Sequence, residues 1–183
     1  MPDEIIVKHC SPTLAGLKTG NLFTVAYASR EEMTKGIRNV NRRLTPKGLR
    51  VLPLRYRDGK ALVYLYRPAR LDADLSDAEA SRLLRELGYT YATTEQCIIS
   101  LIHRLQSTEE FPHEIGLFLG YPPEDVRGFI ENKAAGYKCV GCWKVYGDAA
   151  EVQKAFCRQK KCTAVYCEQW ANGKSIEQLT VAV

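Results

Sequence analysis

Four of the seven cysteines have a spacing that could support metal binding. Cys139 and Cys142 form a Cys-x-x-Cys pair with an internal glycine, as in a zinc knuckle, and Cys162 and Cys167 follow further along the chain. A strong zinc signal would add a second Cys-x-x-Cys or a His pair, and the chain has neither. On a continuous helix, residues five apart diverge by about 140°, so the later cysteines could converge only across a break. Zinc or iron bound by these four residues is one interpretation, and core or half-buried thiols are the other.

A second group of residues combines a thiol, two imidazoles, an amine and a carboxylate. His9 and Cys10 precede a loop that Pro12 predicts and that carries Lys18, and His113 and Glu114 stand at a predicted helix start. We predict that these five residues line a ligand pocket. The pocket would be enzymatic if His113 comes within hydrogen-bonding reach of Cys10 or Lys18, because a catalytic thiolate needs a positioned base. The alternative is that all five are structural polar residues with satisfied hydrogen bonds.

Positive charge is concentrated in residues 30–70. The net charge of the chain is +5, and this block holds twelve Lys or Arg against three Asp or Glu, a net of +9. Residues 71–131 hold four against twelve, a net of −8. A basic face could bind nucleic acid, whereas two oppositely charged halves could instead pack against each other. The candidate nucleic-acid contacts are Lys35, Arg38, Arg42, Arg43 and Lys47.

These basic residues lie on a predicted helix that leads into a β-hairpin. Residues 29–32 form a capping box, and residues 45–48 end the helix. Two alternating arms, residues 50–56 and 61–67, flank an Asp-Gly turn at 58–59 and predict the hairpin. Pro53 places the first arm at a sheet edge or a bulge. The apolar stripe of the helix is Met33, Ile37, Val40 and Leu44.

The remaining patterns predict one α+β domain over residues 1–183, with a mainly antiparallel or mixed sheet. Residues 22–28 have the composition of a buried strand, and residues 76–132 form a helical middle section. Within that section, capping patterns begin helices at residues 76–79 and 93–96. Residues 137–146 resemble a strand. A helix follows residue 148, and residues 162–183 are ambiguous, with a helix favoured over a strand.

Residues 115–130 match the apolar and glycine spacing of a DNA-binding helix-turn-helix. Its second helix, however, would begin with Pro123, Glu124 and Asp125. Two carboxylates at that position would meet phosphates and base edges, which disfavours DNA binding. Acidic residues in a first turn do suit the helix dipole. We therefore predict a structural pair of helices that completes a hydrophobic core.

Composition places the chain among ordinary globular proteins. Hydrophobic residues make up 45% and charged residues 26% of its 183 residues. No apolar run reaches the roughly 18 residues of a membrane span, and the N-terminus lacks the pattern of a signal peptide. We expect a cytoplasmic protein with reduced thiols and no membrane partner.

Three blocks carry a family resemblance: HCSPTLAGLKTGNLF near the start, FPHEIGLFLGYPPEDVRGFIEN in the middle and GCWKVYGD after it. The chain resembles the bacterial family known as domain of unknown function 3793 over nearly its whole length. The resemblance implies a stand-alone cytosolic protein of anaerobic Gram-positive bacteria. It implies no activity and assigns no catalytic residue.

The leading functional hypothesis is a non-enzymatic binding or accessory protein that acts through thiols or a bound metal. It rests on the cysteine-rich C-terminal third and on the segment containing His9 and Cys10. The first alternative is an enzyme that uses a Cys/His/Lys pocket between residues 9–20 and the helix start at 112–114. The second is nucleic-acid binding through the basic region of residues 30–70.

Overall fold

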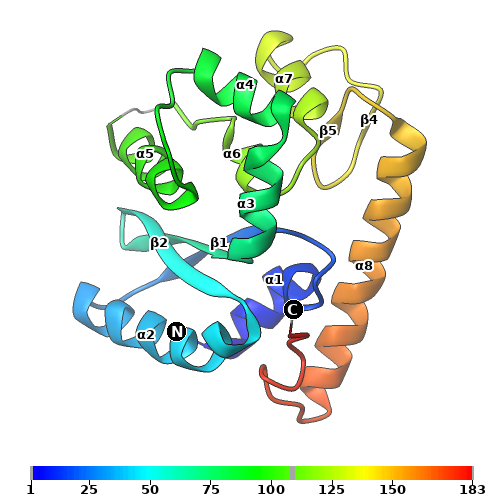
Figure 1. The fold of residues 1–183 in the computed structure, drawn as a ribbon. Coiled ribbons are helices and arrows are strands. Elements are labelled where there is room, and N and C mark those ends of the chain that lie inside the picture. Colours follow the sequence, from blue (N-terminus) through cyan, green and yellow to red (C-terminus); the bar gives the residue numbers. More distant parts are fainter. Residues whose placement is uncertain (1, 108–109, 183) are drawn as a thin grey trace. The chain divides into compact units, whose positions relative to one another are not determined.

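The computed structural model describes residues 2–107 and 110–182 (Figure 1). By its internal contacts the chain divides into two compact units, residues 1–69 with 159–183, and residues 70–158. Helices and antiparallel strands alternate in blocks along the chain, which confirms the predicted α+β class. The prediction that residues 1–183 form a single domain stays a prediction.

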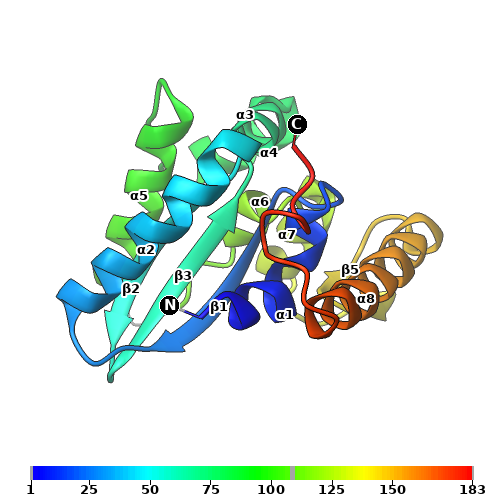
Figure 2. The same ribbon diagram turned by 90° about the horizontal axis from the view of Figure 1, so that it is seen from below.

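The first unit is built on an antiparallel sheet. Its strands β1 (Gly20–Ala26), β2 (Arg50–Arg57) and β3 (Lys60–Tyr66) lie in the order β1-β3-β2 (Figure 2). Asp58 and Gly59 join β2 to β3 with φ angles of 49° and 70°, as the predicted hairpin turn requires. The hairpin and the strand predicted within residues 22–28 are thereby confirmed.

A bulge in β2 decides which way its arginines face. β2 is an edge strand, as Pro53 predicts, and its pairing with β3 shifts between Pro53 and Arg55. Val51 pairs with Leu65 in the core, whereas Arg55 pairs with Leu62 on the opposite face. Without the extra residue, Arg55 would share the face of Val51. The bulge therefore keeps a charged side chain out of the core.

Two helices cover the core face of this sheet (Figure 2): α1 (Asp3–Leu14) and α2 (Arg30–Leu44). The α2 prediction is confirmed, because the Ser29 hydroxyl accepts a hydrogen bond from the Glu32 backbone N–H at 3.1 Å. A 3-10 turn, η1 (Thr45–Lys47), then ends at Gly48. The predicted apolar stripe is buried in full: Met33, Ile37, Val40 and Leu44.

The N-terminal segment differs from the sequence prediction. His9 and Cys10 do not precede a loop on extended chain but lie within α1. The buried positions Ile6, Cys10 and Leu14 recur every four residues and form one helical face. Pro12 suggested a loop, but it lies inside the last turn of the helix, where its missing N–H removes one backbone hydrogen bond.

A buried arginine ties the C-terminal tail to this unit. Arg67, 2% exposed, donates hydrogen bonds from Nε to the Thr13 carbonyl and from Nη2 to the carbonyls of Leu14 and Val181, each at 2.8 Å. The first two carbonyls are at the C-terminal end of α1, where a cation also suits the helix dipole. The tail is thus held by the same side chain that closes α1.

The helix favoured for the C-terminal region is present as α8 (Ala149–Ala171). The boundary between the two units falls within it. In the first unit, Tyr166 and Trp170 pack against the core, and Gly173 follows the helix end with a φ of 88°. Beyond the helix, Ile176 and Leu179 enter the core.

The second unit contains the predicted helical section. Its helices are α3 (Pro68–Ser76), which begins just before the unit boundary, α4 (Ala78–Glu86), α5 (Thr94–Ser107), α6 (Ile115–Phe118) and α7 (Pro123–Glu131). Asp77, and not Ser76, caps α4: its Oδ1 accepts from the N–H groups of Glu79 and Ala80 at 2.9 and 3.0 Å. At α5 the predicted cap is confirmed, since the Thr93 hydroxyl accepts from the Gln96 N–H at 3.3 Å.

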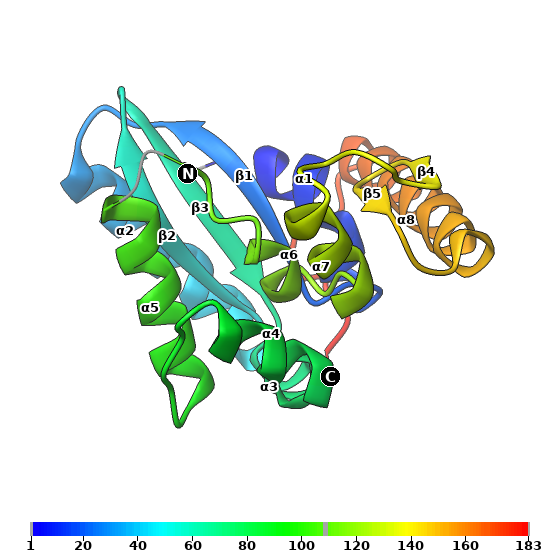
Figure 3. The ribbon, with the colours of Figure 1, turned by 90° about the horizontal axis from the view of Figure 1, so that it is seen from above.

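The strand predicted over residues 137–146 is wrong. The segment folds into a small hairpin of β4 (Cys139–Val140) and β5 (Lys144–Val145), with residues 141–143 at its turn (Figure 3). Gly141 allows this turn to approach Phe156 closely: a Cβ on it would lie 2.3 Å from the phenylalanine Cδ2. A tight turn and a neighbouring helix, neither visible in the alternation of residues, replace the single strand.

Candidate ligand pocket

A buried carboxylate joins α7 to the β4–β5 hairpin. Asp125, 2% exposed, accepts hydrogen bonds at Oδ1 from the N–H groups of Tyr146 and Gly147, at 2.7 and 2.8 Å. Its Oδ2 accepts from the indole Nε1–H of Trp143 at 2.8 Å. Three donors satisfy the buried charge. Asp125 was predicted to serve the helix start, and its main task is to position the hairpin.

Stacked aromatic rings continue from this anchor. The Trp143 ring lies on the ring of Tyr121, with centroids 4.3 Å apart and planes 22° apart. On its other side, Phe156 of α8 meets Trp143 edge-on at 4.5 Å. Offset and edge-to-face pairs of this kind contribute about 0.5–1.5 kcal/mol beyond their burial. The loop before α7, the hairpin and the start of α8 are thus linked through one indole.

A pocket of about 280 Å³ opens between α6, α7 and the hairpin. Its wall is mostly apolar and aromatic, with a few polar groups, which is the usual composition of a small-molecule site. Every lining residue belongs to the second unit. The side chains that line it include His113, Tyr121, Phe129, Cys142, Trp143 and Lys144.

The polar side chains of the pocket differ in their contacts within the protein and in their exposure. Lys144 is engaged: its Nζ donates to the Ala134 carbonyl at 2.7 Å and lies 4.7 Å from the ring centroid of Tyr137. Cys142 and His113 are exposed, and the imidazole contacts Phe129 edge-on at 4.8 Å. Burial, and to a lesser degree the Cys142 thiol, raises the pKa of Tyr121 to about 12, so this phenol is neutral near pH 7. The pocket therefore offers an exposed thiol and a neutral phenol beside stacked rings.

The predicted His/Cys/Lys pocket draws on both units. In the first unit, His9 is exposed and stacks on Phe23 at 6.4 Å, Lys18 is buried, and Cys10 is fully buried in the core. Burial raises the pKa of the Cys10 thiol far above its usual range, which disfavours a thiolate there. His113 and Glu114 belong to the second unit. A pocket that combines all five residues stays a prediction.

Glu114 is part of a buried polar network. It is 5% exposed and accepts a hydrogen bond at Oε1 from the Tyr89 hydroxyl at 3.0 Å. Arg104 Nη1 lies 3.4 Å from the same oxygen, and its guanidinium stands over the Tyr89 ring at 4.5 Å. Burial is the largest cause that raises the pKa of Tyr89 above its usual range, followed by the charge of Glu114. These contacts agree with the structural alternative for this residue.

The four candidate metal ligands are also divided between the units. Val140 and Cys142 line the pocket, whereas Cys139 does not, so the pair does not converge on this cavity. Cys162 and Cys167 lie on the unbroken helix α8, which directs them about 140° apart. Within residues 2–107 and 110–182, no three His, Cys, Asp or Glu side chains gather as metal ligands do. A metal bound by all four cysteines stays a prediction.

Several of the candidate nucleic-acid contacts have protein partners. Arg43 binds Asp3 and Glu177 through its guanidinium, and Lys47 donates to the Thr180 carbonyl at 3.1 Å. Lys35 pairs with Glu31 at 2.8 Å on the exposed side of α2. Arg38 and Arg42 are exposed on the same helix. Nucleic-acid binding by this group stays a prediction, with Arg43 and Lys47 tied to the fold.

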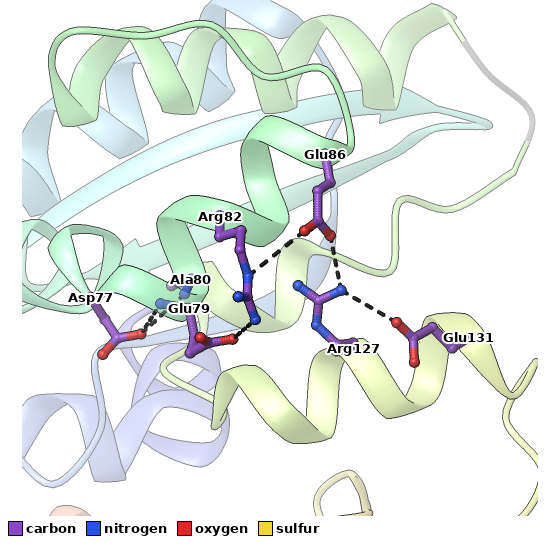
Figure 4. Close-up of polar contacts among 7 residues, drawn as sticks. All are labelled: Asp77, Glu79, Ala80, Arg82, Glu86, Arg127 and Glu131. Carbon is purple, nitrogen blue, oxygen red and sulfur yellow. Dashed lines mark hydrogen bonds and ion pairs between the residues drawn. The ribbon is translucent and has the colours of Figure 1, made fainter.

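Ion pairs hold α7 against α4. Arg127 Nη1 lies 2.8 Å from Glu86 and 3.3 Å from Glu131, and Arg82 connects Glu86 with Glu79 (Figure 4). Val126 of α7 is buried, and so are all four residues of α6. The second helix of the helix-turn-helix pattern is packed on both sides, against α4 and against β5. This packing agrees with the predicted structural role of the two helices.

A family model described as "Protein of unknown function (DUF3793)" matches residues 6–180. The chain belongs to this family. The resemblance carried by the three sequence blocks is thereby confirmed. No curated protein and no solved structure matches the chain. Among the described residues of this DUF3793 protein, none of the helices combines the length and the apolarity that a membrane crossing requires.

Sequence patterns missed most of the pocket of this DUF3793 protein. Tyr121, Phe129 and Trp143 were visible as aromatic residues near glycines, but only the fold brings them together. His113 and Cys142 were assigned to two different predicted sites, and both line this pocket. The most useful missed signal was the Trp143–Gly147 segment, whose donors bind Asp125 from about twenty residues away.

Proposed function

We propose that the protein is a non-enzymatic binding protein and that its ligand occupies the pocket between α6, α7 and the hairpin. One observation carries the proposal: a stacked Tyr121–Trp143 pair and an exposed Cys142 thiol line the same cavity. Asp125 holds the hairpin side of that cavity in place with three hydrogen bonds. A prearranged wall lowers the entropic cost of binding.

The chemistry of the wall favours a flat, largely apolar small molecule. Its aromatic rings would stack with a planar ligand, and a volume of about 280 Å³ suits a molecule of one or two rings. The nearby Lys144 ammonium favours an anionic substituent over a cationic one.

A thiol role suits this site better than a metal role. Cys142 is exposed at the pocket, and no cluster of three ligand side chains gathers among the described residues. All seven cysteines are free thiols, which agrees with the proposed bacterial cytoplasm as the compartment. In this proposal the Cys142 thiol contacts the ligand and makes binding sensitive to thiol modification.

The proposal can be tested with 8-anilinonaphthalene-1-sulfonate, a flat anionic probe whose fluorescence rises in apolar sites. Cys157 is the other exposed cysteine, and it does not line the pocket, so it supplies a matched control. In a Cys157→Ser variant, one N-ethylmaleimide adduct on Cys142 should weaken probe binding at least about tenfold. In a Cys142→Ser variant, the adduct on Cys157 should leave probe binding within about twofold. Equal affinity after both treatments, or no probe binding by the untreated protein, would contradict the proposal.

A further inference from the structure

A second hollow lies on the sheet of the first unit, on the face opposite α1 and α2. Its volume is about 270 Å³, close to that of the pocket between α6, α7 and the hairpin. Its lining, in contrast, is mostly polar and basic. The lining side chains come from all three strands and from the β2–β3 turn: Thr24, Arg55, Arg57, Asp58, Lys60 and Leu62.

Strand register brings these side chains together. Thr24 of β1 pairs with Leu62 of β3, which pairs with Arg55 of β2. Two residues further toward the turn, and on the same face, Lys60 pairs with Arg57. Residues directly opposite one another in an antiparallel sheet share a face, and neighbouring strands are about 4.8 Å apart. The three cations therefore stand on one face within two adjacent rows.

The bulge at Pro53 is what completes this group. An unbulged β2 would direct Arg55 toward the core, and Arg57 with it. The register shift sends both guanidinium groups to the face of Thr24 and Lys60 and leaves Tyr56 to pack against the core. An irregularity that costs ladder hydrogen bonds thus gathers positive charge at one place.

The lining of the hollow contains more basic than acidic side chains. Three cationic side chains face one acidic side chain, Asp58, whose carboxylate lies 3.4 Å from Arg57 Nε. The Arg57 and Asp58 side chains are 59% and 87% exposed, so this pair is weak and an incoming anion could displace it. Like charges held this close repel one another, and an anion between them relieves that repulsion.

We propose that this hollow binds a phosphate group. Two guanidinium groups offer the planar, bidentate donors that suit phosphate oxygens, and Lys60 adds a point charge. The Thr24 hydroxyl, on the same face, can donate a further hydrogen bond. This hollow shares no lining residue with the pocket between α6, α7 and the hairpin. A negative result for phosphate binding would therefore leave the proposed function unchanged.

Calorimetric titration with inorganic pyrophosphate at low salt tests the site. A triple variant, Arg55→Gln with Arg57→Gln and Lys60→Gln, should weaken binding at least about tenfold, because it removes three charge-assisted contacts to the phosphate oxygens. The matched control removes the same charge from α2 through Lys35→Gln, Arg38→Gln and Arg42→Gln, and should change binding less than about threefold. Thr24→Val, which keeps every charge, should weaken binding measurably and guards against misfolding of the triple variant.

One further probe identifies the source of the phosphate. A ten-residue oligothymidylate that binds more tightly than pyrophosphate, with a steep dependence on salt, would assign the site to a nucleic-acid backbone. Pyrophosphate binding without oligonucleotide binding would assign it to a small phosphorylated metabolite. Absence of binding by every phosphate probe, or equal losses in the triple variant and in the α2 control, would overturn the proposal.

Discussion

The Nε1–H of Trp143 donates to Oδ2 of Asp125 across 2.8 Å, although 18 residues separate them in the sequence. Both partners are consequently fixed: the indole forms one wall of the pocket, and the carboxylate spans α7 and the hairpin. A buried charge with three donors also makes this junction sensitive to small changes.

Asp125→Asn keeps the shape of the side chain but removes its charge and one acceptor. The amide NH₂ would face either the Trp143 indole or the backbone N–H groups, all of which are donors. We expect the free energy of unfolding to fall by about 1–3 kcal/mol, measured by urea titration. Glu95→Gln, on the exposed side of α5, is the control and should change it by less than about 0.5 kcal/mol. Equal stability of both variants would show that the carboxylate is dispensable.

Gly141→Ala tests the close approach of the hairpin to α8. The new Cβ would lie 2.3 Å from Phe156 Cδ2, closer than any real contact allows. We expect a loss of about 1–3 kcal/mol from overpacking, seen as a lower melting temperature. Adding Phe156→Leu should restore part of the loss, because it removes the ring that the methyl group meets. If the double variant loses more stability than the two single variants lose together, this explanation is contradicted.

Arg67→Lys tests the anchor of the C-terminal tail. Lysine keeps the charge but cannot donate in the fixed fork that reaches the carbonyls of Thr13, Leu14 and Val181. We expect unfolding to become easier by about 2–4 kcal/mol, since buried carbonyls lose donors. Hydrogen exchange should be faster at the Val181 N–H, which bonds to Leu14. Unchanged exchange there would argue against a shared anchor.

The Arg43–Glu177 pair predicts a dependence of stability on acid. The hydrogen bond from Arg43 lowers the pKa of Glu177 from 4.5 to about 2. A lowered pKa in the folded state gives stability that is complete above pH 4.5 and is lost as the pH falls toward 2. Because the Glu177 side chain is 35% exposed, we expect only about 1 kcal/mol from this pair.

Urea titrations at pH 7 and pH 3 measure that contribution. Glu177→Gln should lower the free energy of unfolding at pH 7. Between pH 7 and pH 3, this variant should lose less stability than the parent protein. Glu168→Gln, on the exposed surface of α8, is the matched control and should follow the parent. If the Glu177→Gln variant loses as much stability between pH 7 and pH 3 as the parent protein does, other carboxylates are responsible for that loss.

Local signals predicted the elements whose stability is local. The capping hydroxyl of Ser29 and the Asp58-Gly59 turn each act over a few residues, and both α2 and the β2–β3 hairpin were predicted correctly. Pro53 indicated an edge or a bulge, and β2 has both. The segment of Cys139 was misassigned because its conformation depends on Asp125 and Phe156, which come from other elements.

The same distinction explains the candidate site. Residue chemistry alone singled out His113 and Cys142, but spacing could not place them in one cavity, since the 28 residues between them carry no periodic pattern that links them. In α1 the helical period of Ile6, Cys10 and Leu14 indicated a helix, whereas Pro12 is a residue type that usually ends one. Long-range pairing and a proline near a helix end are the two features of this chain that local sequence patterns do not reveal.

The central claim, a ligand site walled by Trp143, is tested most directly by two-dimensional ¹H–¹⁵N NMR of the indole N–H groups. The chain has two tryptophans, so the spectrum should contain one signal from Trp143 and one from Trp170, assigned with Trp170→Phe. Titration with 8-anilinonaphthalene-1-sulfonate should shift the Trp143 signal progressively and leave that of Trp170, which packs against the core of the first unit, in place. Saturable probe binding with an unmoved Trp143 signal would contradict the account.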